Sequence, residues 1–211
     1  MAVERFKPAR TKQFLDVGCG LGACVQAASE LGWTAQGCEL GEWVLKETRR
    51  KGINARIGSL EELHYNSESM DAVFFGSCLE YLGDPVKTLK ESCRILKTSG
   101  LLIGSGDVNG RWLKFLGPEQ LKKCYSAPPE MINYFTAKSI KTLLQKTGFK
   151  LLSLKTLGLP AGWTKRRQAS LPAENRSGEF SFFYRIAKTA INSFLNLTGI
   201  GYSIRFIAKK K

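Results

Sequence analysis

One short stretch near the start of the chain constrains its fold more than any other: Leu15-Asp16-Val17-Gly18-Cys19-Gly20-Leu21-Gly22. The segment 13–17 predicts a buried β-strand, and three glycines spaced by one residue each follow at once. A helical pattern then covers 23–31. Glycines accept sharp turns and leave no Cβ in the way of a ligand. The order of strand, glycine turn and helix therefore indicates a site that holds a nucleotide at a helix N-terminus.

The acid before the turn indicates which nucleotide suits the site. Gly18, Gly20 and Ala23 also fit the dinucleotide fingerprint G-x-G-x-x-G/A. Asp16, however, precedes the turn at a position that is usually apolar in that fingerprint, and its carboxylate would repel a pyrophosphate. A carboxylate favours a ligand with a cationic end, and S-adenosylmethionine carries an ammonium and a sulfonium but no phosphate. The alternative is a tight turn that binds no ligand.

The run from Asp16 to Gly22 resembles the first motif of class I S-adenosylmethionine-dependent methyltransferases. The resemblance covers residues 12–104, and 125–157 more loosely. The later segment is similar to one in a small, mostly bacterial group of these enzymes, in which two prolines precede a histidine; here Met131 stands at the histidine position, after Pro128-Pro129. The resemblance implies a methyltransferase with S-adenosyl-L-methionine as its cofactor.

Candidate cofactor ligands lie at the ends of the predicted strands. Glu39 lies 19 residues beyond Gly20, where a carboxylate can accept hydrogen bonds from both ribose hydroxyls of an adenosine. In the family an acid often stands at the Ser59 position and meets the adenine amino group. We expect the cofactor to contact Asp16, Gly18, Cys19, Gly20, Gly22, Glu39, Leu40, Ser59, Leu60 and Ser77.

The segment 77–82 resembles the family segment that runs beside the methyl-donating sulfur, and many relatives have a histidine where Tyr81 stands. A phenol can hydrogen-bond an acceptor oxygen, but its unperturbed pKa near 10 makes it a poor base. Glu80 could serve as the base if burial raises its pKa. Glu80 and Tyr81 are therefore the candidate catalytic residues, and the alternative is that they only shape the pocket wall. A strong base is not obligatory, because the sulfonium methyl is already activated and alignment matters most.

The rest of the chain alternates strand and helix patterns, which is typical of an α/β, doubly wound parallel sheet. We expect strands over 13–17, 34–40, 54–57, 70–76, 101–104, 149–157 and 200–208. Asp84-Pro85 opens a helix that Gly100 is expected to end, and further helices are expected over 42–51, 137–147 and 177–198. The resemblance implies a Rossmann-like seven-stranded sheet whose last strand is antiparallel, between strands five and six. We expect one domain over 1–211, with a cofactor-binding half (1–110) and an acceptor-side half (111–211).

Charge divides the chain unevenly. Residues 111–211 hold 19 Lys and Arg against four Asp and Glu, a net charge of +15, whereas the first half is near neutral. Such asymmetry favours an anionic partner, which could be a nucleic acid, a phosphorylated substrate or a membrane surface; basic surface used for solubility is the alternative. The apolar stripe of the helix expected over 177–198 favours packing on the sheet, with a position on a membrane surface as the alternative.

Composition narrows the compartment and the chemistry. The first 12 residues carry no apolar signal-peptide core. Six cysteines without C-x-x-C spacing and a single histidine indicate reduced thiols in a cytoplasmic protein and no metal site. The prediction is methyl transfer, by family analogy to an oxygen of a small-molecule or glycan-precursor acceptor that carries phosphate. An RNA methyltransferase and a non-catalytic binding protein that keeps the fold are the alternatives, and the oligomeric state is left open.

Overall fold

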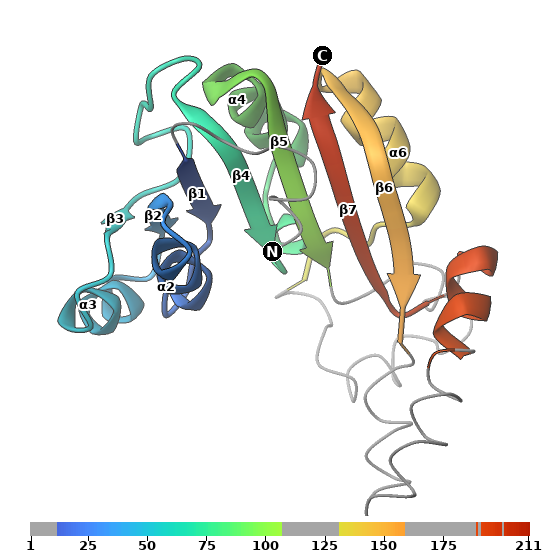
Figure 1. Cartoon of the computed structure of the whole chain (residues 1–211), viewed down its shortest axis with the longest axis horizontal. Coiled ribbons are helices and arrows are strands. Elements are labelled where there is room, and N and C mark those ends of the chain that lie inside the picture. Colours follow the sequence, from blue (N-terminus) through green and yellow to red (C-terminus); the bar gives the residue numbers. More distant parts are fainter. Residues whose placement is uncertain (1–11, 107–130, 159–188, 190, 200) are drawn as a thin grey trace, which may run out of the picture.

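In the computed structural model, the described residues are 12–106, 131–158, 189, 191–199 and 201–211. They form one seven-stranded sheet in the order β3-β2-β1-β4-β5-β7-β6 (Figure 1). The strands are β1 (Gln13–Val17), β2 (Thr34–Glu39), β3 (Ala55–Ile57), β4 (Met70–Gly76), β5 (Leu96–Gly106), β6 (Phe149–Leu157) and β7 (Ser203–Lys210). Neighbours are parallel except β7, which is antiparallel to both β5 and β6. The doubly wound fold and the antiparallel last strand expected from the sequence are confirmed.

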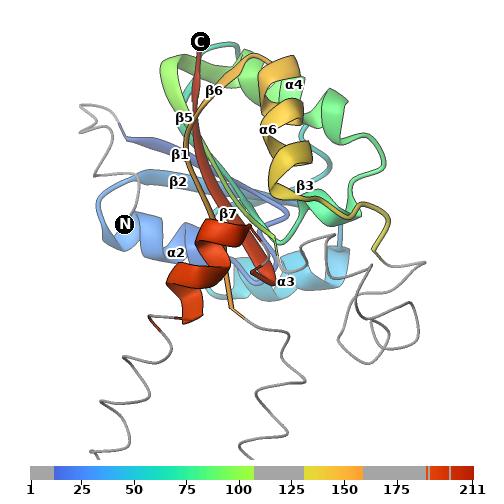
Figure 2. The same cartoon turned by 90° about the vertical axis from the view of Figure 1, so that its right-hand side faces the viewer.

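Helices lie on both faces of this sheet, as the view in Figure 2 shows. The helices are α2 (Ala23–Glu30), α3 (Glu42–Arg50), α4 (Pro85–Ile95) and α6 (Ala137–Lys146), with a short 3-10 helix η1 (Leu79–Tyr81) after β4. Leu89 of α4 and Leu144 of α6 pack in one core cluster, while Val25 of α2 and Leu45 of α3 pack in the other. Each face of the sheet therefore has its own hydrophobic core.

Local sequence explains where several elements begin. β4 is apolar at nearly every position because helices cover both of its faces. Helix α4 begins after Asp84, whose side chain accepts a hydrogen bond from the Lys87 amide at 2.9 Å. Thr136 caps α6 through a reciprocal pair of hydrogen bonds with Ser139.

Two boundaries differ from the sequence expectation. Helix α4 ends at Ile95 and runs directly into β5, so Gly100 lies within a strand and does not end the helix. The fully buried Leu96 begins that strand, and Lys97 pairs with the buried Asp71 at 2.7 Å, which fixes the chain in the sheet. The last strand begins at Ser203 and extends to Lys210, because Lys209 pairs with Leu101 of β5. Lys209 and Lys210 therefore belong to the sheet, beyond the end at residue 208 that the sequence predicted.

Several predicted segments lie wholly or partly outside the described residues: 125–130, most of the loop over 158–178, and the first part of the helix expected over 177–198. Residues 191–198 are helical as predicted. Of the helices formed by the described residues, none combines the length and the apolarity that a membrane span requires.

The packing of β7 beside β5 requires a glycine at position 104. Gly104 lies directly opposite Phe206, and a Cβ built on it would overlap the phenyl ring. We expect Gly104→Ala to lower the free energy of unfolding by about 1–3 kcal/mol, the usual cost of overpacking a core. Chemical denaturation of both proteins measures this. Ser105→Ala, on the opposite face of the same strand, is the matched control, and equal denaturation midpoints for the two variants would contradict the assigned packing.

Candidate functional site

The turn between β1 and α2 has an open surface. Gly18, Gly20 and Gly22 have φ angles of 69°, 52° and 77°, which side-chain-bearing residues rarely adopt. A Cβ built on Gly20 would have no atom within 4 Å. Described side chains therefore leave the backbone open to a ligand at Gly20, whereas Cys78 and Ile53 lie close to Gly18 and Gly22.

The Glu39 carboxylate ties this turn to the end of β2. Its Oε2 accepts a hydrogen bond from the Gly20 amide at 3.0 Å, and its Oε1 accepts from the amides of Leu40 at 2.8 Å and Gly41 at 3.1 Å. Bonds from backbone amides to an ionised carboxylate are strong and directional. Glu39 is therefore held in place before any ligand arrives, and it faces the glycine turn as the sequence predicted.

A cavity of about 290 Å³ lies at the carboxyl ends of β1, β2 and β4. In open α/β sheets this is where ligands bind, at the point where the strand order reverses. Six of the predicted cofactor residues line the cavity: Gly18, Glu39, Leu40, Ser59, Leu60 and Ser77. Residues from four different strand ends, far apart in sequence, are thus brought to one place.

The other four predicted cofactor residues do not line this cavity: Asp16, Cys19, Gly20 and Gly22. The amides of Gly18 and Cys19 both donate to the Cys38 carbonyl, at 2.9 and 3.0 Å, and the Gly22 amide donates to Cys19 at 2.9 Å. The Cys19 side chain packs on Gly37, where a Cβ would overlap its sulfur. These amides hold the turn together. Among the described groups none donates to the Gly18 carbonyl, so the turn offers a ligand an acceptor at this position.

Asp16 is buried at the end of β1, with 3% of its surface exposed. Burial, followed by the negative charge of Glu39, raises the pKa of the Asp16 carboxyl to about 7. Within the described part of the chain no group donates a hydrogen bond to this carboxylate. A cation beside it would lower its pKa and offset the burial of its charge. The site therefore has the electrostatics that suit an ammonium group.

Two cysteines form part of the cavity wall. Burial raises the pKa of both the Cys38 and Cys78 thiols to about 12, and nearby carboxylates act in the same direction. Both thiols are therefore neutral at physiological pH, and they are poor nucleophiles. They act as small apolar groups at the base of the cavity, where a Cβ on Gly18 would lie 2.7 Å from the Cys78 sulfur.

Sequence reasoning missed two polar residues of the cavity. Glu61 and Thr88 both line it, and the Thr88 hydroxyl donates to Glu61 Oε1 at 2.6 Å. Ser59, a predicted cofactor residue, forms two hydrogen bonds with its neighbour Glu62. Its hydroxyl accepts from the Glu62 amide at 3.3 Å, and its own amide donates to the Glu62 carboxylate at 2.9 Å. The Glu61-Glu62 pair after the third strand was the available signal, but only the fold places Glu61 at the cavity.

The two predicted catalytic residues separate in the structure. Tyr81 lines the cavity and is half-exposed. Glu80 is buried beneath Gly106, in a small separate space lined by Phe135 and Phe206, among others. Glu80 therefore does not face the glycine-turn cavity, and the catalytic roles of both residues stay predictions.

A segment from the second half of the chain holds the 3-10 helix η1 in position. The side-chain amide of Asn133 donates to the Leu82 carbonyl at 2.6 Å, and the amides of Ile132 and Asn133 donate to the Glu80 carbonyl at 3.1 and 2.9 Å. Met131, which the sequence resemblance aligns with a histidine of relatives, is buried. The segment therefore positions Tyr81 through backbone contacts and presents no titratable side chain at 131.

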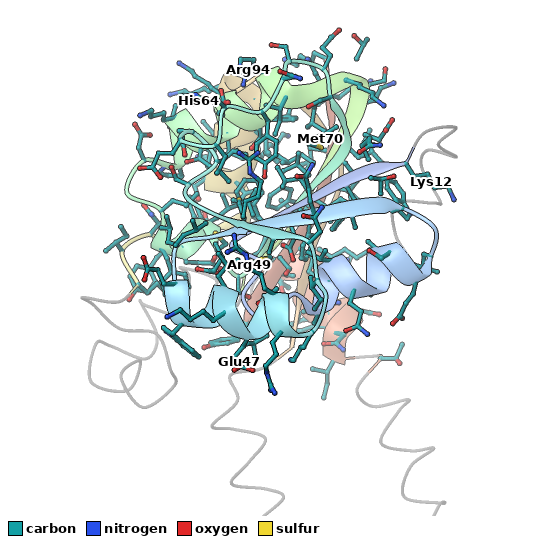
Figure 3. The ribbon with its side chains drawn as sticks, turned by 90° about the vertical axis from the view of Figure 1, so that its left-hand side faces the viewer. Lys12, Glu47, Arg49, His64, Met70 and Arg94 are labelled. Atoms are coloured by element: carbon teal, nitrogen blue, oxygen red, sulfur yellow. The ribbon has the colours of Figure 1, made fainter. Side chains whose placement is uncertain are left out.

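A second, wider depression lies between α4 and residues 61–67, lined by residues that include His64 and Arg94 (Figure 3). The Arg94 guanidinium donates to the Tyr65 carbonyl, to Ser67 Oγ and to Glu91. These bonds fix the loop before β4 on the helix. His64 is exposed and lines this depression, not the glycine-turn cavity.

Comparisons with known proteins agree with this geometry. A family model described as "Methyltransferase domain" matches residues 15–104. An uncharacterized protein of Methanocaldococcus jannaschii is 29% identical over 116 residues, which are 54% of this chain and 55% of that protein. A ubiquinone biosynthesis O-methyltransferase of Xanthomonas oryzae is 32% identical over 95 residues, which are 42% of this chain and 40% of that protein. The chain spans about half, or less, of the length of the curated relatives that it matches.

Solved structures share the fold over nearly the whole chain. A SAM dependent methyltransferase from Archaeoglobus fulgidus has a TM-score of 0.67 at 20% identity, covering 99% of this chain and 90% of that chain. An S-adenosylmethionine dependent methyltransferase from Mesorhizobium loti has a TM-score of 0.66 at 17% identity, covering 99% and 96%. The class I methyltransferase fold expected from the sequence is confirmed.

The buried Asp16 predicts an unusual dependence of stability on pH. The unfolded chain loses this proton near pH 3.8, whereas the folded chain keeps it to about pH 7. Stability from this group is complete below pH 3.8 and falls as pH rises through that window, by up to about 4 kcal/mol. We expect Asp16→Asn to remove this fall in denaturation measurements from pH 4 to pH 8. Asp84→Asn, an exposed cap, should retain it; parallel pH profiles for wild type and Asp16→Asn would refute the assignment.

Proposed function

Because residues 15–104 of this chain match the methyltransferase-domain model, we propose that the protein transfers the methyl group of S-adenosylmethionine to an acceptor. One observation carries the proposal: Glu39, on the wall of the 290 Å³ cavity, is held by the amide of Gly20 in the glycine turn, and the buried Asp16 lies just before that turn. The two carboxylates lie where a molecule with a cationic end and a ribose would need them.

Each part of the cavity has a separate binding role. The Asp16 carboxylate and the Gly18 carbonyl are acceptors for the ammonium, which is a pure donor. The Glu39 carboxylate accepts hydrogen bonds from three backbone amides. It can still accept a further hydrogen bond from a ribose hydroxyl. Leu40 and Leu60 frame the adenine. Glu61 supplies a carboxylate for the adenine amino group, the role that Ser59 lacks the charge to perform.

The cofactor supplies a methyl group that is already activated on a sulfonium. The protein's task is then to align the acceptor behind that methyl group and to exclude water. Tyr81, on the cavity wall, orients the acceptor through its hydroxyl. Its position is fixed by Asn133, so the acceptor side of the site is set by residues from the second half of the chain.

The acceptor atom in this proposal is an oxygen of a small molecule or glycan precursor that carries phosphate. Curated relatives named ubiquinone biosynthesis O-methyltransferases support an oxygen acceptor. The net charge of +15 over residues 111–211 supports a phosphorylated one. Incubating the protein with a cell extract and methyl-labelled cofactor tests the activity directly: label should pass to a small, anionic product, and no transfer to any component would refute it.

Cofactor binding gives a sharper test. We expect Glu39→Gln to weaken S-adenosylmethionine binding by about 1–3 kcal/mol, because the amide loses charge and one acceptor toward the ribose. Isothermal titration with S-adenosylmethionine and its demethylated product measures this. Affinity should also rise with pH up to about 7, since the ionised Asp16 binds the ammonium.

The matched control is Glu47→Gln on the outer surface of α3 (Figure 3), which removes the same charge away from the cavity. Equal affinities for the Glu39 and Glu47 variants would contradict the role given to Glu39.

A further inference from the structure

Like charges face each other directly on two neighbouring strands. In the β6–β7 ladder, Lys150 lies opposite Lys209 and Lys155 lies opposite Arg205. A register shift between Leu151 and Ser153 puts both pairs on one face of the sheet. Like charges in directly opposed positions destabilise a sheet. These four residues, the basic sheet face, therefore need an explanation beyond the stability of the strands.

No described acid neutralises this face. Residues 131–158, 189, 191–199 and 201–211 contain nine Lys and Arg and no Asp or Glu. Within the described part of the chain, none of the four cations forms an ion pair with a carboxylate. Lysines on an exposed edge strand can prevent aggregation. That accounts for Lys150 and Lys155 on the edge strand β6, but not for Arg205 and Lys209 on β7, which is paired on both sides.

Helices α2, α3 and α6 do not cover this face. Helix α6 packs on the opposite face, where Ile140 and Leu144 meet Phe149, Phe206 and Ala208. Helices α2 and α3 pack over β1, β2 and β3, at the other end of the sheet. Lys150, Lys155 and Arg205 are exposed, and Lys209 is half-buried. The four cations therefore lie on the face of the sheet opposite the one on which α6 packs; Figure 2 shows α6 on one side of β6 and β7.

A helix with exposed apolar side chains, residues 191–198, is attached to the same edge strand, β6. Thr156 directly follows Lys155, and it binds the helix over 191–198 twice: its hydroxyl donates to the Leu195 carbonyl at 2.7 Å, and its amide to Asn196 Oδ1 at 3.1 Å. Leu195 is buried against the strand, whereas Phe194 is 60% exposed and Leu197 is 86% exposed. The two exposed residues therefore leave apolar surface on a helix that is attached to the strand carrying Lys150 and Lys155.

We propose that the basic sheet face and the helix over 191–198 together dock the protein on an anionic phospholipid bilayer. Cations near an anionic surface each contribute about a five-fold gain in affinity, and exposed apolar side chains enter the interface between headgroups and acyl chains. Nucleic acid fits the surface less well. The four residues of the basic sheet face are not aromatic, and neither are Ser153 and Ile207 between them. Single-stranded bases therefore have no aromatic side chain on which to stack at these positions. This proposal does not depend on the enzymatic one.

The test uses the full chain and sedimentation with vesicles. One set of vesicles is phosphatidylcholine alone, and the other mixes phosphatidylcholine with phosphatidylglycerol. We expect binding to the mixed vesicles only, weakening as salt rises. Changing Lys150, Lys155, Arg205 and Lys209 to Gln should lower the affinity on the order of a hundred-fold or more. The matched control changes Lys46, Lys51, Lys87 and Lys90 to Gln, which removes the same charge from α3, its end and α4, and should bind nearly as wild type.

A second arm tests the apolar part. Phe194→Ser with Leu197→Ser should leave thermal unfolding nearly unchanged, because both side chains are exposed, yet lower the vesicle affinity that remains at high salt. The proposal is overturned by equal binding to both vesicle types, or by a Gln variant of the sheet face that binds like the control. It is also overturned if a single-stranded RNA oligonucleotide binds this face with steep salt dependence while vesicles do not bind.

Discussion

The three hydrogen bonds that Glu39 accepts from backbone amides are the constraint on which the site depends. They join the glycine turn after β1 to the turn after β2, two loops that no strand pairing holds together beyond the sheet edge. A turn of glycines with positive φ has many alternative conformations, and an anchored carboxylate selects one of them. The anchor therefore fixes the part of the cavity wall that Gly18, Glu39 and Leu40 form.

The electrostatics of the cavity follow from burial. Asp16 is held where its charge is poorly solvated, and the charge of Glu39 adds to the penalty. The thiols of Cys38 and Cys78 stay neutral for the same reason. The site therefore presents concentrated negative charge against an apolar wall. A cationic ligand would offset the repulsion between these buried negative charges, whereas a phosphate would add to it. This is the physical reason for preferring a sulfonium nucleoside to a dinucleotide as the ligand.

One sheet carries two surfaces of opposite character. All described acids precede residue 92, and many of them cluster around the ends of β1, β2 and β3. All nine described cations of the second half lie on or beside β6, β7 and α6. Because β7 is inserted between β5 and β6, the cationic strands β6 and β7 lie at one edge of the sheet. Glu39 lies at the end of β2, near the other edge. An anionic surface bound at β6 and β7 would therefore lie away from Glu39 and Asp16, the two carboxylates proposed to bind the cofactor.

The sequence by itself determined the strand-turn-helix unit, the order of strands and helices, and six residues of the cavity, because glycine spacing, hydrophobic periodicity and caps are local signals. It did not determine that Glu61 and Thr88 join the cavity, that Glu80 turns away from it, or that Gly100 lies inside a strand. Those outcomes depend on contacts between segments far apart in the chain. The sequence also did not predict that Lys150 and Lys155 lie opposite Lys209 and Arg205. That pairing depends on the register between β6 and β7, which are neighbours only in the folded sheet.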